Sequence, residues 1–225
     1  VEREKGVVLS ERRDRNTYGY LDLVDRVAFE MPRIRMADRM PIGTQETISG
    51  ATAETLKAFW ARNYRPERAV LTIVGDFAPD AAEAAIRRHF ADWQAEQVAA
   101  PVRIVGQPDL TREPAVDVFL HPALSESVTA SREGEARIAP DTIEERRQEV
   151  LAWLGEAIVN RRLARLARQE DPPFKAASFA TTDVFRVGRL SQLSVDTEEG
   201  KWQRGIDAAV AEYRRALAGG FSEGE

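Results

Sequence analysis

Apolar residues recur at helical spacing along five stretches of the chain, and each stretch predicts a helix with one buried side. The first stretch covers the opening thirty residues. The second follows Thr52, an expected N-cap with Glu54 in the first turn, and ends before Pro66. The third begins at Pro79, because proline suits the first turn of a helix.

The second half of the chain carries the two remaining helical stretches. A long one begins at Asp141, where Glu144 completes an expected capping box, and Pro172 ends it. The last contains Trp202 and ends at Gly219. The side chains expected to face a core are Leu56, Phe59, Trp60, Tyr64, Ile86, Phe90, Trp93, Val150, Leu151, Leu154, Ile158, Leu163, Leu166, Ile206, Val210, Tyr213 and Leu217.

Continuously apolar or alternating runs predict four strands. AVLTIVGD (69–76) is a β-branched run closed by Gly-Asp, which is typical of a strand buried on both faces. The others are VDVFL (116–120), SESVTASR (125–132) and RLSQLSVDT (189–197). Residues 95–114 lose this periodicity and are punctuated by proline and glycine, which is typical of a linker. The order of elements predicts the back half of one α/β domain followed by the front half of another.

Composition and charge argue against several classes of protein and several kinds of site. A net charge of −5, with no basic cluster on a recognition element, argues against a nucleic-acid binder. No run of about 18 apolar residues occurs, so we expect no membrane span in this chain. The absence of cysteine excludes disulfides and cysteine-ligated metal, and it suits cytoplasm and periplasm equally. His89 and His121 are not in a metal-ligand pattern, so a metal site built from histidines within these residues is not expected.

Two carboxylates share one side of the first predicted helix. Within EREKGVVLSE, Glu4 and Glu11 are seven residues apart, with Val7 and Val8 between them. At 3.6 residues per turn these four side chains lie within about 100° of one another. A solvated helix end explains the pattern by itself. A carboxylate on an apolar side otherwise needs a cation to offset its burial.

The sequence resembles the pitrilysin/insulinase family of zinc metallopeptidases, the inverzincins. The similar segments follow one another at family-like spacing through nearly the whole chain. They are EREKGVVLSE (2–11), RMPIGTQETISGATAETLKAFWARNYRPERAVLTIVGDF (39–77), NRRLARLARQEDPPF (160–174) and AGGFSEGE (218–225). The joint order of four segments identifies the family better than any one segment does.

The resemblance implies an α+β fold, the metallopeptidase repeat, in which helices pack on one side of a sheet. Residues 1–97 would be the C-terminal half of a first, zinc-ligand-bearing repeat and residues 98–114 a linker. Residues 115–225 would be the N-terminal part of a second repeat without metal ligands. Val1 falls inside a helix-like stretch and Ser222 resembles the cap of a further helix, so we expect both ends of the chain to be cut.

The resemblance also assigns roles to the two acids. In the family, zinc is held by two histidines of an HxxEH helix and by a glutamate about 75 residues downstream, with a supporting acid seven residues before it. Glu11 matches the zinc ligand and Glu4 the supporting acid. The HxxEH segment is not among these residues, so we expect this part alone to bind zinc weakly and to lack peptidase activity.

The expected function is therefore that of a part of a zinc metalloendopeptidase acting on peptides or unfolded polypeptide segments. Its expected partners are the remaining repeats of the same protein or a partner subunit. One alternative is a catalytically degenerate family member serving as scaffold, partner subunit or peptide-binding domain. Another is an unrelated α/β module whose Glu4 and Glu11 are solvated. An upstream HxxEH would separate these hypotheses.

Three further features refine the expectation. Pro41–Thr44 (PIGT) resembles bacterial family members, many of them exported to the periplasm, while a cytoplasmic location stays open. At 171–174 the chain has Asp-Pro-Pro-Phe where the family has Gly-Leu-Ala-Tyr, so a substrate-binding role of that tyrosine is not carried over. We interpret the arginines between Arg161 and Arg168 as a solvated helix face.

Overall fold

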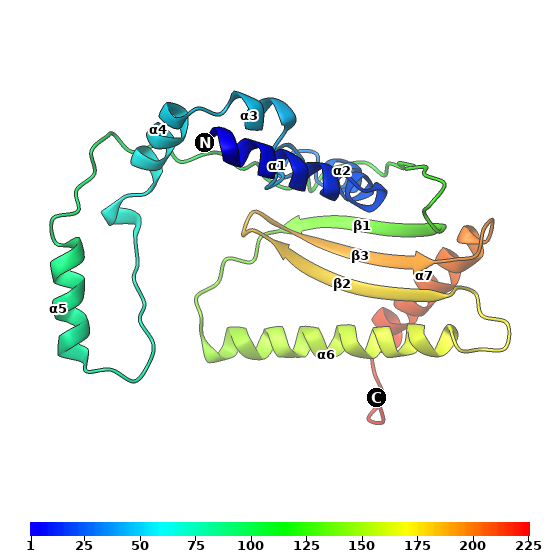
Figure 1. Ribbon diagram of the computed structural model, residues 1–225. Coiled ribbons are helices and arrows are strands. Elements are labelled where there is room, and N and C mark those ends of the chain that lie inside the picture. Colours follow the sequence, from blue (N-terminus) through cyan, green and yellow to red (C-terminus); the bar gives the residue numbers. More distant parts are fainter. The chain divides into compact units, whose positions relative to one another are not determined.

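The computed structural model describes residues 1–225, which form two compact units. Unit 1 comprises Val1–Asp14 and Pro41–Ile104, and unit 2 comprises Arg15–Met40 and Val105–Glu225. The units thus interleave along the chain, and the predicted repeat boundaries stay a prediction. The elements, labelled in Figure 1, are α1 (Glu2–Arg15), α2 (Tyr18–Glu30), η1 (Ala37–Arg39), α3 (Gln45–Gly50), α4 (Ala53–Asn63), η2 (Pro66–Arg68), α5 (Pro79–Phe90), β1 (Ser127–Glu135), α6 (Ile143–Leu166), β2 (Ala176–Val184), β3 (Gly188–Asp196) and α7 (Trp202–Gly219).

Unit 1 is built from helices whose starts are fixed by threonine caps. The Thr52 hydroxyl accepts from the backbone N–H of Thr55, and the Thr55 hydroxyl accepts from the N–H of Thr52. Thr44 and Thr47 form the same reciprocal pair at the start of α3. Each arrangement satisfies amide groups that the first turn leaves without helical partners. The predicted cap at Thr52 is therefore confirmed.

The prediction of a buried strand at residues 69–76 was wrong. This segment is extended but belongs to no strand, and the Val70 and Val74 side chains are 93% and 92% exposed. A strand exists only when a neighbour accepts and donates its backbone hydrogen bonds, and unit 1 contains no strand. The side chains predicted to form the buried face of α4 are about half exposed, because no other element covers them. They are Leu56, Phe59, Trp60 and Tyr64.

Unit 2 contains a three-stranded antiparallel sheet in the order β1-β3-β2. Helix α6 packs along β2 and α7 along β3, and both contribute to one apolar core on the same face of the sheet (Figure 1). The predicted α+β class, with helices packed on one side of a sheet, is confirmed. On the other face, near the end of α2, the buried Glu30 accepts a hydrogen bond from Gln192 of β3 at 2.8 Å.

The core of unit 2 joins α6, β3 and α7. Leu163 of α6 and Val195 of β3 are fully buried, and Ala209 of α7 packs with them. A Cβ at Gly205 would lie 2.6 Å from the Thr197 side chain, so the helix approaches the sheet there at a distance that excludes a larger residue. Close packing of this kind makes the buried positions sensitive to loss of volume.

The opening thirty residues are mostly helical, as predicted, and they form two helices because Thr17 caps a new helix after Arg15. Several predictions in unit 2 need correction. Helix α6 is capped by Thr142, while Asp141 pairs instead with Arg146. Strand β2 was not predicted, and residues 116–120, predicted as a strand, form none. The first half of α6 also exposes apolar residues that were expected in a core: Val150, Leu151 and Leu154.

The hairpin between β2 and β3 is predicted to be stabilised by changing its turn. Phe185 and Arg186 have φ of 47° and 59°, and the turn closes through the Val187 N–H to the Val184 carbonyl at 2.8 Å. Side chains other than Gly, Asn and Asp are strained in this left-handed region. Replacing the pair with Asn-Gly should raise the free energy of unfolding by about 1–2 kcal/mol. Urea denaturation measures this, and a loss of stability would show that Phe185 makes stabilising contacts.

Candidate metal-ligand site

The two candidate acids lie on one stripe of α1. Seven residues correspond to about 20° of rotation and about 10 Å along the helix axis, so Glu4 and Glu11 are stacked two turns apart. Val7 lies between them and is exposed, and α1 has no buried residue. The structure therefore brings the two acids to one face, as the spacing predicted. Within the described residues no element buries that face.

The charges along α1 pair locally at its first turn. The Glu4 carboxylate accepts from the Arg3 guanidinium at 2.9 Å, with both side chains largely exposed, and Lys5 pairs with Glu2 at 2.8 Å. Exposed pairs of this type contribute about 1 kcal/mol or less. Because opening the pair with Arg3 costs little free energy, the Glu4 carboxylate can exchange Arg3 for a partner that binds it more strongly.

Residues 1–225 do not supply a complete metal site. No cluster of three or more histidine, cysteine, aspartate or glutamate side chains is placed to hold a metal ion. His89 lies in the last turn of α5, and His121 stacks on Tyr18 with ring centroids 5.1 Å apart while its Nδ1 accepts from the Ala123 N–H. A carboxylate such as Glu11 fits one ligand position of a zinc site, and a catalytic site needs three.

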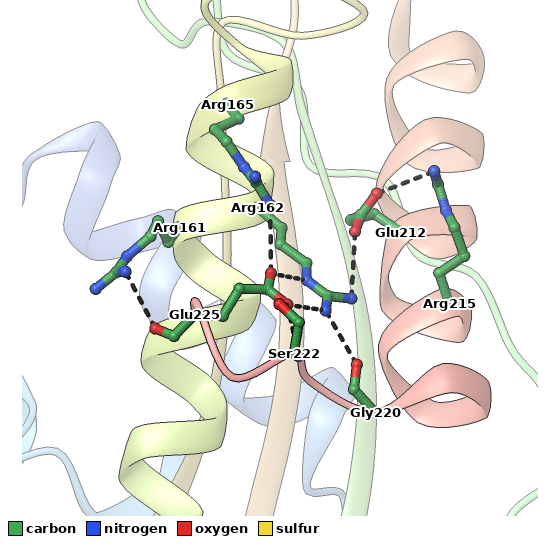
Figure 2. A network of polar contacts seen from close by, with 8 residues as sticks. All are labelled: Arg161, Arg162, Arg165, Glu212, Arg215, Gly220, Ser222 and Glu225. Carbon is green, nitrogen blue, oxygen red and sulfur yellow. Dashed lines mark hydrogen bonds and ion pairs between the residues drawn. The ribbon is translucent and has the colours of Figure 1, made fainter.

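A second polar cluster, not predicted from the sequence, lies in unit 2 where α6 and α7 meet the last residues (Figure 2). Arg162 donates from Nε and Nη2 to the two oxygens of Glu225, both at 2.6 Å, and from Nη2 to the Gly220 carbonyl at 3.0 Å. Arg165 reaches the same carboxylate at 3.4 Å. Arg161 donates to the Glu225 main-chain oxygen at 3.2 Å.

This network corrects the interpretation of the arginines as a solvated face. The Arg162 side chain is only 14% exposed, while that of Arg165 is 64% exposed and fits the prediction. Glu212, itself buried, lies 3.8 Å from Arg162 and 2.9 Å from Arg215. The bidentate geometry is the strongest form of an arginine–carboxylate pair. The network joins residues 220–225 to α6.

Glu126 is another residue that the sequence did not single out. Its carboxylate accepts from the backbone N–H groups of Gly200, Lys201 and Trp202 at 2.9–3.1 Å and from the Thr197 hydroxyl at 2.9 Å. These donors stabilise the charged form, so they lower the pKa of Glu126, with the Gly200 N–H contributing most. The side chain thereby caps the start of α7 from a distant part of the sequence.

Stability at acid pH should depend on Glu225. The hydrogen bonds from Arg162 are the main cause that lowers the pKa of this carboxyl well below its ordinary value of 4.5. The folded state then binds the proton more weakly than the unfolded chain does. The stabilisation is complete above pH 4.5 and is lost as the pH falls toward the lowered pKa.

A series of melting temperatures between pH 3 and pH 7 measures this contribution. Glu225→Gln should lower the melting temperature at pH 7 and flatten its fall on acidification. Glu223→Gln, a neighbouring acid outside the network, is the matched control and should follow the unmodified chain. A Glu225→Gln profile parallel to that of the unmodified chain would contradict the assignment.

No helix of the structure has the length and apolar character that crossing a bilayer requires.

Residues 50–225 of the chain match a protein family described as "Peptidase M16 inactive domain". A zinc protease PQQL-like protein of Arabidopsis thaliana is 26% identical over 197 residues, which cover 86% of this chain and 20% of that protein. The matched family range begins after Glu4 and Glu11.

Solved structures share the fold. The periplasmic protease PqqL of Escherichia coli has a TM-score of 0.78 at 21% identity, covering 98% of this chain and 24% of PqqL. A mutant of the ferredoxin protease FusC, in complex with Arabidopsis ferredoxin, has a TM-score of 0.78 at 24% identity, covering 96% of this chain and 24% of FusC. The chain thus spans about a fifth to a quarter of the length of these relatives.

The α+β fold is shared with solved structures of proteases, and the family match covers residues 50–225. The chain belongs to the peptidase M16 family, the pitrilysin/insulinase family of zinc proteases.

Proposed function

We propose that these residues are an internal part of a zinc-dependent metalloendopeptidase that hydrolyses peptides or unfolded polypeptide segments. Family membership supports the zinc protease class, and the short span relative to the relatives supports a longer parent protein. The observation that carries the site is the placement of Glu4 and Glu11 on one stripe of α1, a helix without buried residues. In the parent, that stripe faces the HxxEH helix.

Each acid has a distinct part in this proposal. Glu11 provides the third protein ligand. Glu4 supports this ligand through neighbouring groups, which orient the Glu11 carboxylate and raise its basicity. Zinc, when bound, polarises the peptide carbonyl and lowers the pKa of its water. The chain's own contribution is therefore to complete and orient a coordination sphere. The histidines and the general base come from outside residues 1–225.

The second half of the chain has a different role. Residues 115–225 are proposed as the start of a repeat that binds no metal and closes around extended substrate, with residues 98–114 as linker. The match of residues 50–225 to a domain described as inactive supports this assignment. The ferredoxin complex of FusC supports a protein as the class of substrate.

The same observations favour one rival, a degenerate member that binds polypeptide without cleaving it. The parent and residues 1–225 should therefore be assayed side by side, with an internally quenched peptide and with metal analysis by mass spectrometry. The proposal expects zinc and turnover in the parent, and neither in residues 1–225. Peptide binding without zinc or turnover in the parent would establish the rival instead.

Replacing Glu4 with Gln in the parent should weaken zinc affinity or activity by about 10–100-fold, the usual cost of losing a group that supports a metal ligand. Zinc competition with a chromophoric chelator gives the affinity independently of turnover. Glu2→Gln changes an exposed acid of the same helix outside the stripe and should leave both values unchanged. Equal effects of the two changes would indicate a general charge effect and contradict the role of Glu4.

A periplasmic location is proposed for the parent. Its support is the structural likeness to PqqL, which is described as a periplasmic protease. Fractionation of cells expressing the parent, followed by immunoblotting, tests this. Recovery with the cytoplasmic fraction would contradict it.

A further inference from the structure

Part of the predicted linker is bound along the segment that follows α2. Ile34 and Gly106 form an isolated antiparallel β-bridge, and the Arg35 N–H donates to the Val105 carbonyl at 2.9 Å. Both segments belong to unit 2, although they are far apart in the sequence. Residues 105–112, here called the strap, therefore pair with another part of the chain, whereas a linker makes few contacts.

Gly106 lets the two backbones approach more closely than any other residue would allow. Its φ is 97°, and an added Cβ would lie 2.0 Å from the Arg33 carbonyl oxygen and 2.9 Å from the Ile34 Cα. Both of these atoms belong to the backbone, so no side chain can move aside to admit a methyl group. The strap is therefore fitted to this segment at a position that only glycine can occupy.

The Arg112 guanidinium binds the C-terminal end of α2. It donates to the Phe29 carbonyl and, at 3.4 Å, to the Glu30 carbonyl, and its Cζ lies 4.5 Å from the centroid of the Phe29 ring. The last carbonyl groups of a helix have no partner within the helix, so this contact satisfies acceptors that α2 leaves free. A cation over an aromatic face adds a further attraction. Arg112 thus holds both the main chain and a side chain of the helix end.

The strap and the end of α2 are also fixed to the sheet. Asp109 pairs with Arg33 at 2.9 Å, and the Asp109 N–H donates to the Glu133 carboxylate of β1 at 2.9 Å. The Asp109 side chain is only 12% exposed. Four apolar side chains, from the segment after α2 and from strands β2 and β3, are buried together: Met31, Ile34, Val184 and Leu190. Polar and apolar contacts therefore join three parts of unit 2 at one place.

We propose that the strap fastens α2 rigidly to the sheet of unit 2 and is not a flexible connection. A flexible connection has few contacts and solvent-exposed backbone groups. The strap has a backbone pair, a glycine fitted against backbone, a bound helix end and an ion pair. Consequently α2 and the sheet move as one body, and any hinge of the parent lies outside residues 105–112.

This inference is independent of the proposed zinc site. All of its contacts lie within unit 2, and none of them involves Glu4 or Glu11. Failure of the inference would consequently leave the proposed peptidase role of the parent unaffected.

Residue-resolved hydrogen exchange, measured by NMR on the whole chain, tests the strap directly. The Arg35 and Asp109 amides donate within the contacts of the strap, whereas the Asp117 and Val118 amides soon after it have no backbone acceptor. After correction for intrinsic rates, exchange at Arg35 and Asp109 should be slower by at least about tenfold. Equal rates for the two pairs would show a flexible connection and overturn the proposal.

Gly106→Ala should open the strap, because its methyl group has no room against the Arg33 carbonyl. Exchange at Arg35 should rise by about tenfold or more, and by more than at Leu163, whose amide reports unfolding of the core. Gly200→Ala is the matched control, since Gly200 also has a positive φ, 75°, but no atom lies within 4 Å of an added Cβ. It should change the exchange at Arg35 no more than at Leu163. A folded Gly106→Ala chain with the unmodified rate at Arg35 would overturn the proposal.

Arg112→Ala keeps the test decisive if Gly106→Ala does not fold. It removes the contact with the end of α2 without introducing a clash. Exchange at Arg35 should again rise by more than at Leu163. Arg132→Ala, at an exposed position of β1, should leave the exchange at Arg35 unchanged. Equal effects of Arg112→Ala and Arg132→Ala would overturn the proposal.

Discussion

Replacing Glu11 with Gln in the parent protein is expected to remove bound zinc and to abolish peptide turnover. Gln keeps the size and the helix but loses the negative charge that offsets the dication, and neutral amide oxygen is a poor zinc ligand. A catalytic zinc site with three protein ligands does not tolerate the loss of one. The decrease should exceed about 100-fold, the upper range for losing a mere supporting group.

Two controls make this result specific. Glu2→Gln changes another acid of α1 and should retain zinc and activity. Glu11→Asp keeps the charge with a shorter reach, so partial zinc binding is expected. Circular dichroism should give the same helix content for all variants, since α1 has no buried residue whose packing could fail. Full zinc content in Glu11→Gln would contradict the assignment of Glu11 as ligand.

Replacing Leu163 with Ala is expected to cause the largest loss of stability in unit 2. Leu163 is fully buried in the core between α6, β3 and α7. Removing its branched side chain forfeits transfer free energy and leaves a cavity, which together cost about 2–5 kcal/mol. Urea unfolding followed by circular dichroism should show the midpoint shifting to lower urea with little change in slope.

Ile143→Ala is the matched control for this substitution. Ile143 lies in the same helix but is exposed, so its truncation should change the free energy of unfolding by about 0.5 kcal/mol or less. A similar loss for both variants would show that helix propensity, and not core packing, sets the stability. A loss below about 1 kcal/mol for Leu163→Ala would contradict the central position of this side chain.

Local pattern predicted the helices well because helix formation depends on neighbours within one turn. The cap at Thr52 and the core position of Leu163 were read from such spacing. Strand prediction was weaker, because a strand needs a partner that sequence pattern does not reveal. The run at 69–76 has strand character without a neighbour, and β2 was missed because Ala, Ser and Thr dilute its alternation.

The candidate site could likewise be predicted only where it depends on local sequence pattern. The spacing of Glu4 and Glu11 placed both acids on one face of a helix, but their role came only from the family resemblance. Glu225 lies 63 residues from Arg162, and Glu126 lies 74 residues from the amide of Gly200. Partners so distant in sequence leave no local pattern, since only the tertiary fold brings them together.

The most direct measurement is the sequence of the encoding gene upstream of Val1. The account predicts an HxxEH motif about 75 residues before Glu11, on a segment of helical periodicity. That result would supply the two histidines and the general base that residues 1–225 lack. An upstream segment of the same family without those histidines or that glutamate would contradict the peptidase assignment and leave a polypeptide-binding protein.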